Sequence, residues 1–537
     1  MKQSGRLSYD KCLGMLGTTA MWIVRIVGSL IFVVLTRYAL QYTQYSNPYG
    51  EERSISVYDS IAKNILFFIL TVAVLVGLFV LEKHMSAQIQ KWVMRIALVL
   101  VTVWTGGFGY WWITAIDRLP VGDQAFIYGG ASYFLEGQYV FLSEGQYCEM
   151  FPYQLGLVFL IEILFRLVGP YNYFAFQFIC VMLSVGIVLL GYALICEFTE
   201  HVAVAVAYCL LMFTCLPMIF YTGWVYGEIP SIFFYVLTAV CVMRYHKTAH
   251  ARWLAGMVGS VFMAILVRNN SMIMLVALCL VAGIYMLQRK DKRLLVALLA
   301  AVILPTLAYQ GIYKMYEVRS GYPHKEGVPM VSYVAMGLQE TDGKCGWYNN
   351  YVKEVYYGQE FNSDMAALES QLYIRSRLEE FKANPSAART FFKNKILSQW
   401  NAPLYQSVFF SSQYGNGIAP VPGSFLDKLS GEKFTSVLGI CDRVQFILYV
   451  GMLCYFLFAV KKDGNMLEYL LAVTMIGGFF FSIIWEAKAR YIFPYYVTMF
   501  PLAVVGYWQA IVRIKALFAR KPKAKSEDNI IPFERVA

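Results

Sequence analysis

Charged residues are scarce in this chain. Of its 537 residues only 15% are Asp, Glu, Lys or Arg, whereas 58% are hydrophobic and the mean hydropathy is +0.52. Soluble domains carry about 25% charged residues, so this composition excludes an ordinary water-soluble protein. Together with the long apolar runs, it indicates an integral membrane protein.

Histidine is also scarce, and closely spaced cysteine pairs are lacking. The chain has 5 histidines, and none of its 11 cysteines belongs to a C-x-x-C motif. Most cysteines lie within apolar runs, where they behave as small buried hydrophobes. We therefore expect neither a zinc site nor a disulfide framework. Cys148 and Cys345 fall in long polar loops, which leaves one pairing open.

Three catalytic motifs are missing as well. The chain contains no G-x-x-x-x-G-K-[ST], no H-E-x-x-H and no G-x-S-x-G. Their absence argues against nucleotide hydrolysis, zinc proteolysis and serine hydrolysis of those types.

The net charge of +11 comes from short basic clusters between apolar segments. Such clusters are typical of cytoplasmic loops and do not form the continuous basic face that binds nucleic acid. The start of the chain, MKQSGRLSYDK, is basic and polar, and no small-residue cleavage site follows the first apolar run. We interpret that run as a retained anchor and not as a signal peptide.

Thirteen apolar segments are candidates for membrane spans: 16–38, 62–82, 93–116, 152–168, 173–196, 201–221, 229–244, 253–267, 270–288, 293–315, 441–460, 466–485 and 490–512. If 152–168 does not cross, all the basic clusters fall on one side of the membrane. This segment is short, and it carries Glu162 and Arg166 one helical turn apart, a pair that is costly when it faces lipid. We expect it to be a re-entrant or interfacial helix, with both termini in the cytoplasm.

The predicted fold is an all-α polytopic membrane protein with about 12 transmembrane helices. A juxtamembrane helix and a mixed, mainly helical extracytoplasmic insertion complete it. The expected divisions are an extra helix pair at 1–92, a transmembrane core at 93–316 with a first outer loop at 117–151 and the juxtamembrane helix at 152–168, the insertion at 317–440, C-terminal transmembrane helices at 441–512, and a cytoplasmic tail at 513–537.

The first outer loop contains RLPVGDQAFIYGGASYFLEGQY, in which Asp123 follows a membrane helix directly. A carboxylate that is half desolvated there has raised basicity, which suits a general base. Its position equally permits Asp123 to cap the helix that follows. The residues alone leave both roles open.

Two further polar residues lie at the outer ends of expected helices. Glu228, in WVYGEIPS, fits either a substrate site or a stabilising position at a helix N-terminus. Arg268, in ILVRNNSM, fits either a phosphate site or simple snorkelling to the interface.

The densest group of charges is WEAKARYIFPYY, residues 485–496. Because Arg and Lys both bind phosphate oxygens, Lys488 and Arg490 suggest a phosphate clamp. A local pair between Glu486 and Arg490, one helical turn apart, is the alternative. His324, in GYPHKEG, either adds to the clamp or lies in a solvated loop.

These motifs, in this order, resemble those of the GT-C superfamily of membrane glycosyltransferases, which includes protein O-mannosyltransferases and lipid A aminoarabinose transferases. The resemblance covers roughly 93–512 and rests on VGDQAFIYGGASYFLEG, FPYQLGLVFLIEILFRLVGP, VYGEIPS, VRNN and EAKARY. The N-terminal helix pair has no counterpart. The first loop reads Asp123-Gln124-Ala125 in place of the D-x-D metal pattern of the oligosaccharyltransferase branch, so we expect no cofactor and no metal.

The resemblance implies that a sugar moves with inversion from a polyprenyl-phosphate donor to an acceptor hydroxyl on a cell-wall polymer, a lipid-linked glycan or a protein. It implies that Asp123 is the catalytic base. A polyprenyl phosphate leaves readily when cations hold its charge, so we expect Arg268, Lys488 and Arg490 to bind the donor phosphate. The expected supporting residues are Tyr226, Glu228, His324, Glu486 and Tyr491. The expected location is a bacterial plasma membrane, with the active site extracytoplasmic. A transporter and a polymer ligase acting on a lipid-linked glycan are the alternatives.

Overall fold

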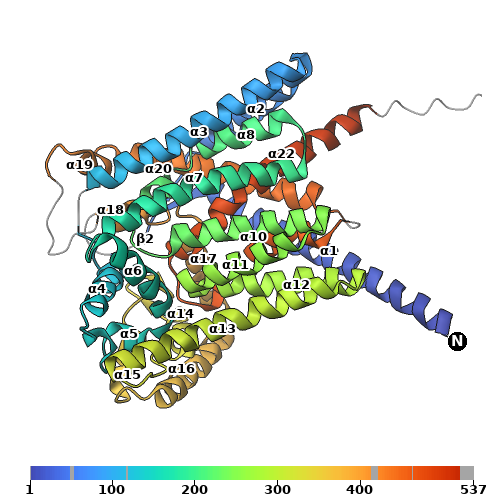
Figure 1. Cartoon of the computed structure of the whole chain (residues 1–537). Coiled ribbons are helices and arrows are strands. Elements are labelled where there is room, and N and C mark those ends of the chain that lie inside the picture. Colours follow the sequence, from blue (N-terminus) through green and yellow to red (C-terminus); the bar gives the residue numbers. More distant parts are fainter. Residues whose placement is uncertain are drawn as a thin grey trace, which may run out of the picture.

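A computed structural model describes residues 2–48, 52, 54–116, 119–412, 421–461 and 464–519. Helices dominate this part of the chain, and its strands form only two short hairpins, β1–β2 and β3–β4 (Figure 1). The predicted all-α polytopic fold is confirmed.

Ten helices in the described residues are long and apolar enough to span a membrane. They coincide with ten of the twelve spans expected from hydropathy. The helices concerned are α1 (Lys2–Gln41), α2 (Ile61–His84), α3 (Ala87–Ile116), α7 (Tyr173–Phe198), α10 (Glu228–Thr248), α12 (Met272–Arg289) with η4 (Asn269–Ser271), α13 (Lys292–Ser320), α20 (Phe434–Cys454) with η6 (Tyr455–Ala459), α21 (Leu470–Ile484) with η7 (Met466–Tyr469), and α22 (Ala489–Ala519).

The two remaining expected spans are less regular. One is a helix pair that bends by 53° between α8 (Val202–Met212) and α9 (Leu216–Phe220), followed by η3 (Tyr221–Gly223). The other is α11 (Ala251–Val267), which has 17 residues. A helix of that length is near the lower limit for crossing the hydrocarbon core.

Close helix packing holds the bundle together. Helix α7 packs against α3 and α10, α11 against α10 and α13, and α20 against α1 and α22. Small residues permit the closest of these crossings, as is usual in membranes. A Cβ on Gly506 of α22 would lie 2.1 Å from the carbonyl oxygen of Gly451 on α20, so a larger residue at this position would push the two helices apart.

The segment 152–168 forms η2 (Pro152–Gln154) and α6 (Leu155–Val168), which turn by 100° from the preceding helices η1 (Val140–Leu142) and α5 (Tyr147–Met150). The expected pair forms, with Arg166 Nη2 2.6 Å from Glu162 Oε1. Glu162 also contacts α13, through Arg319 at 2.8 Å and the hydroxyl of Tyr316 at 2.7 Å. Buried against protein, this carboxylate is satisfied without facing lipid.

The insertion between α13 and α20 is mainly helical, as expected. The stretch SDMAALESQLYIRSRLEEFKANP contains α16 (Ser363–Ala383), and Pro385 starts α17 (Pro385–Trp400). The other elements here are α14 (Met330–Gly337), β3 (Glu340–Thr341), β4 (Lys344–Cys345), α15 (Tyr351–Gly358), α18 (Ser407–Ser412) and α19 (Phe425–Ser430). Cys148 and Cys345 are both buried and free, so the pairing that the sequence left open does not form.

The N-terminal helix pair is joined by a hairpin of β1 (Tyr42–Ser46) and β2 (Ser54–Tyr58). Helix α1 packs on α20, and Arg25 donates a hydrogen bond of 2.7 Å from Nη2 to the carbonyl oxygen of Leu457. This contact satisfies a cation within a membrane helix. At the other end of the chain, α22 continues to Ala519, and the rest of the expected tail lies outside the described residues.

The first helix begins and α22 ends at the same end of the bundle (Figure 1). The short helix α4 (Asp123–Leu135), α6 and the helices α14–α16 lie at the opposite end. The fold therefore places the first outer loop beside the insertion, far from both described ends of the chain.

Candidate active site

Most of the polar residues singled out from the sequence meet at one place. They line two adjoining cavities of about 750 Å³ and 540 Å³. Asp123 and Lys488 line the larger, Arg268 lines the smaller, and Arg490 lines both. Tyr226, Glu486 and Tyr491 also line both cavities, so Asp123 and Arg268 lie in adjoining cavities that share these walls.

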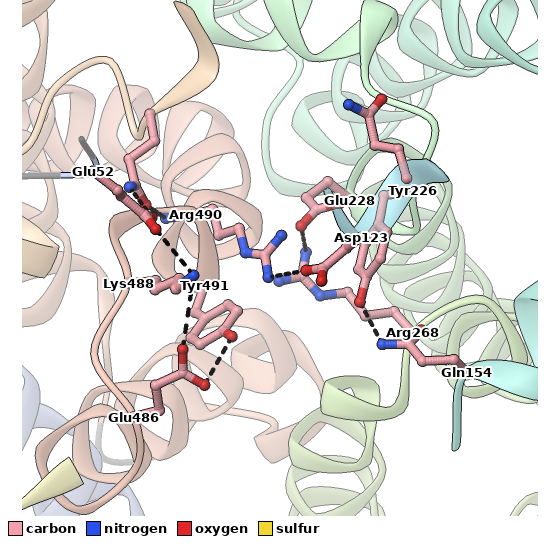
Figure 2. Close-up of polar contacts among 12 residues, drawn as sticks. Glu52, Asp123, Gln154, Tyr226, Glu228, Arg268, Glu486, Lys488, Arg490 and Tyr491 are labelled. Carbon is pink, nitrogen blue, oxygen red and sulfur yellow. Dashed lines mark hydrogen bonds and ion pairs between the residues drawn. The ribbon is translucent and has the colours of Figure 1, made fainter. Parts of the chain in front are cut away.

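Asp123 is the first residue of α4, and Gly122 occupies the capping position before it. The carboxylate of Asp123 does not cap α4 but points to Arg490. Oδ2 of Asp123 accepts a hydrogen bond of 2.9 Å from Nη2 of Arg490, and the Asp123 side chain is 39% exposed (Figure 2). Of the two roles left open by the sequence, the geometry favours a carboxylate facing a cavity over a helix cap.

Glu228 and Arg268 form a buried ion pair. Nη1 of Arg268 lies 3.1 Å from Oε1 of Glu228, and the two side chains are 6% and 1% exposed (Figure 2). The N-terminus of α10 must approach the end of α11 closely to make this contact. A Cβ on Gly227 would lie 2.2 Å from the carbonyl oxygen of Val267, so only glycine fits there.

The segment between α21 and α22 is irregular and is held by the insertion. The amide of Ala487 donates to the carbonyl oxygen of Gly346 at 2.7 Å, and Trp347 pairs with Ala487 as an isolated bridge. These backbone contacts set the direction of the side chains on either side of Ala487. As a result, Glu486 and Lys488 both line the larger cavity.

Glu486 does not pair with Arg490, the alternative suggested by their spacing. Its Oε2 accepts a hydrogen bond of 3.2 Å from the hydroxyl of Tyr491, and its Oε1 lies 3.9 Å from Nζ of Lys488. Arg490 reaches Asp123 instead (Figure 2). The pairing is therefore between distant parts of the chain and not within one helical turn.

Glu52 is a site residue that sequence reasoning missed. It lies in the hairpin of the N-terminal helix pair, and its Oε2 is 3.2 Å from Nζ of Lys488 (Figure 2). Its Oε1 accepts a hydrogen bond of 2.6 Å from Gln406. No local motif marks Glu52, because a single glutamate in a polar turn is indistinguishable from a solvated one.

Arg490 is buried among aromatic rings. Its guanidinium carbon is between 5.1 and 5.9 Å from the ring centroids of four aromatic residues, a distance at which cation–π attraction operates. These rings belong to Trp224, Tyr226, Phe410 and Tyr491. Nε and Nη1 of Arg490 have no hydrogen-bond partner among the described residues. A buried guanidinium with two unused donors is ready to bind an anion.

Tyr226 accepts a short hydrogen bond from Gln154 (Figure 2), and both side chains line the two cavities. Gln154 was not singled out from the sequence, and neither was Lys353 of the insertion, which lines the larger cavity. His324 lies apart from this group. Its ring stacks on Tyr313, 4.0 Å between centroids, and lines a separate cavity of about 320 Å³.

The pKa values of the two carboxyl groups that line the larger cavity are shifted in opposite directions. Burial alone would raise the pKa of Asp123, but the charges of Arg490, Lys488 and Lys353 outweigh it and hold that pKa below the ordinary value. Burial raises the pKa of Glu486, and the nearby charge of Glu52 adds to the effect, although Lys488 and Arg490 oppose it. Asp123 is therefore the group held as a carboxylate, and the raised basicity expected from its half-desolvated position is wrong, because the neighbouring cations outweigh the effect of burial.

A metal site is not evident in the described part of the chain, where no group of three or more His, Cys, Asp or Glu residues is placed to hold an ion. No known family model matches this chain, and no curated protein matches its sequence.

Proposed function

We propose that this protein is a membrane glycosyltransferase that moves a sugar, with inversion, from a polyprenyl-phosphate donor to an acceptor hydroxyl outside the cytoplasm. The observation that carries the proposal is a pair of adjoining cavities, one lined by the carboxylate of Asp123 and the other by the buried guanidinium of Arg268, with Arg490 lining both. This transfer needs a base and cations that bind the leaving phosphate; Arg490 contacts the base directly, and Arg268 lines the cavity beyond it.

In the proposed reaction Asp123 removes the proton from the acceptor hydroxyl. The oxygen attacks the anomeric carbon as the bond between that carbon and the phosphate oxygen breaks, and the bonding electrons leave with the phosphate. Arg490, with two unused donors, stabilises the charge that develops on the leaving phosphate. Because the base and the leaving group act on opposite faces of the sugar, the anomeric centre inverts.

Arg268 and Lys488 are less available than Arg490 to bind the donor phosphate. Each already lies within 3.2 Å of a carboxylate, Glu228 in one case and Glu52 in the other. We assign Arg268 to the phosphate end of the smaller cavity and Lys488 to the larger cavity, next to Asp123. Donor binding then requires the phosphate to compete with these carboxylates.

The position of the site supports an enzyme over a transporter. Carriers usually hold their substrate groups near the middle of the membrane. Here Asp123 starts α4, and Lys353, which lines the same cavity, belongs to α15 of the insertion. Both elements lie at one end of the bundle (Figure 1). The last turns of α2, α10 and α12 carry Lys83, Lys247 and Arg289, at the ends of those helices away from the site, which supports a cytoplasmic location for these ends. We therefore assign the site to the outer face of a bacterial plasma membrane.

The test is a donor assay with the full-length protein in lipid nanodiscs. A panel of polyprenyl-phosphate hexoses carrying radiolabelled sugars is incubated with and without membrane extract as the acceptor source. We expect at least one donor to lose its sugar to an acceptor and to leave polyprenyl phosphate. Transport of intact donor between leaflets, or transfer of a whole lipid-linked polymer with no single-sugar transfer, would refute the proposal.

A further inference from the structure

Lys353 differs from the other charged residues of the larger cavity. Five Asp, Glu, Lys or Arg residues line this cavity: Asp123, Lys353, Glu486, Lys488 and Arg490. Arg490 is paired with Asp123 at 2.9 Å, and Lys488 lies 3.9 Å from Glu486. In the described part of the chain, no carboxylate lies within ion-pair distance of Lys353.

The position of Lys353 is set by the insertion. It lies on the first turn of α15, and its Nζ is 5.9 Å from the ring centroid of Phe151. Tyr348 and Asn350, which precede it in the chain, line the same cavity. The ammonium group therefore faces the space in front of Asp123 from the side of the insertion.

Lys353 shares the larger cavity with Lys488 and Arg490 but is separated from Arg268, which we assign to the phosphate end of the smaller cavity. The smaller cavity, which Arg268 lines, includes Asn269 and Asn270 at the start of a membrane helix but not Lys353. A donor phosphate attached to a prenyl chain must stay near the bilayer. A cation on the extramembrane insertion is therefore placed to meet the other substrate.

An unpaired ammonium group in a partly enclosed cavity attracts an anion more strongly than it would in open water, because the local dielectric is lower. The charge of Lys353 already acts on Asp123, whose pKa it helps to lower. Both side chains line the same cavity. An anion held at Lys353 would thus lie close to the base.

We propose that Lys353 binds a phosphate or carboxylate group of the acceptor, so that the enzyme glycosylates an anionic polyol or sugar whose free hydroxyl lies beside Asp123. This inference rests on the proposed glycosyl transfer and specifies its acceptor. The bound anion sets the acceptor's orientation, and Asp123 removes the proton from its neighbouring hydroxyl. Lys353 is in this sense a specificity-determining residue that contacts the acceptor.

The binding test uses the full-length protein in nanodiscs and ligand-observed NMR. Glycerol 3-phosphate and glucuronate are the anionic probes, and glycerol and glucose are their neutral counterparts. We expect the wild-type protein to bind at least one anionic probe about tenfold more tightly than its neutral counterpart, the low end for a charge-assisted hydrogen bond. The two anionic probes distinguish a phosphate from a carboxylate acceptor.

Two variants complete the binding test. Lys353→Gln should lose most of the preference for the anionic probe, whereas Lys353→Arg should keep part of it. Lys382→Gln is the matched control, because Lys382 is an exposed lysine of the same insertion that does not line the cavity. Equal binding of anionic and neutral probes by the wild type, or an unchanged preference in Lys353→Gln, would overturn the inference.

A kinetic arm separates the inference from the proposed function. With an active donor, Lys353→Gln should raise the KM for an anionic acceptor about tenfold, with a much smaller effect on the KM for the donor. The opposite pattern would place Lys353 in the donor site and overturn the inference while leaving glycosyl transfer intact. If no donor is consumed by the wild type, the proposed function fails, and the NMR arm still decides whether Lys353 binds an anion.

Discussion

Nη2 of Arg490 donates a hydrogen bond of 2.9 Å to Oδ2 of Asp123, although 367 residues separate them in the chain. The proposed base is thus paired with the cation that is best placed to bind the leaving phosphate. A donor phosphate that draws Arg490 towards itself would weaken this pair and increase the basicity of Asp123. Donor binding and activation of the base are therefore coupled in the proposed mechanism.

Replacing the base should abolish transfer without unfolding the protein. Asp123→Asn keeps an oxygen that can accept from Arg490 but cannot take a proton, so we expect kcat to fall by about 10²- to 10⁴-fold. Single-turnover assays with a radiolabelled donor measure the change. The melting temperature should remain near that of the wild type, because Asp123 is partly exposed. Transfer at a near-normal rate would remove Asp123 from the role of base.

Arg490 should be needed as an arginine and not simply as a positive charge. Arg490→Lys retains the charge but loses the planar fork and the unused Nε and Nη1 donors. We expect kcat/KM for the donor to fall by about tenfold to a hundredfold, equivalent to one lost charge-assisted hydrogen bond. Donor titrations provide the measurement, with Lys382→Arg as the control. Unchanged donor saturation would move the phosphate site elsewhere.

The acid limb of the pH profile should respond to the cations near Asp123. The base works only when ionised, so activity falls as the pH drops through its pKa, which lies below the ordinary value. Lys488→Gln removes one of the charges that lower this pKa, and the limb should then shift to higher pH. The shift is read from kcat/KM against pH, and Lys382→Gln should leave the limb in place. A shift to lower pH would contradict the assignment of Asp123 as the titrating base.

The buried pair of Glu228 and Arg268 should matter to stability. Removing one partner leaves the other charged and buried, which typically costs about 3–5 kcal/mol. We therefore expect Glu228→Gln and Arg268→Met each to lower the melting temperature of the detergent-solubilised protein, with the double variant more stable than the sum of the two effects predicts. Thermal unfolding of all four proteins forms a double-mutant cycle. Strict additivity would mean that the pair contributes no coupling.

Much of the fold was predictable because hydropathy and helical signals act locally. The long apolar runs and the charge shortage predicted the membrane helices, and ten of the expected spans are helices long and apolar enough to cross in the described residues. Their position at the ends of expected helices also singled out the polar residues Asp123, Glu228, Arg268 and the segment 485–491. All of these line the adjoining cavities or contact a residue that does.

The sequence by itself determined which groups were available and at which end of the bundle they would lie. Only the tertiary structure decided their partners, which is why Arg490 pairs with Asp123 and not with Glu486, and why Glu52 reaches Lys488. The physical reason is the distance along the chain over which each interaction acts. Helix formation depends on neighbours within a few residues, whereas an ion pair depends on the meeting of segments hundreds of residues apart, and helix packing sets that meeting.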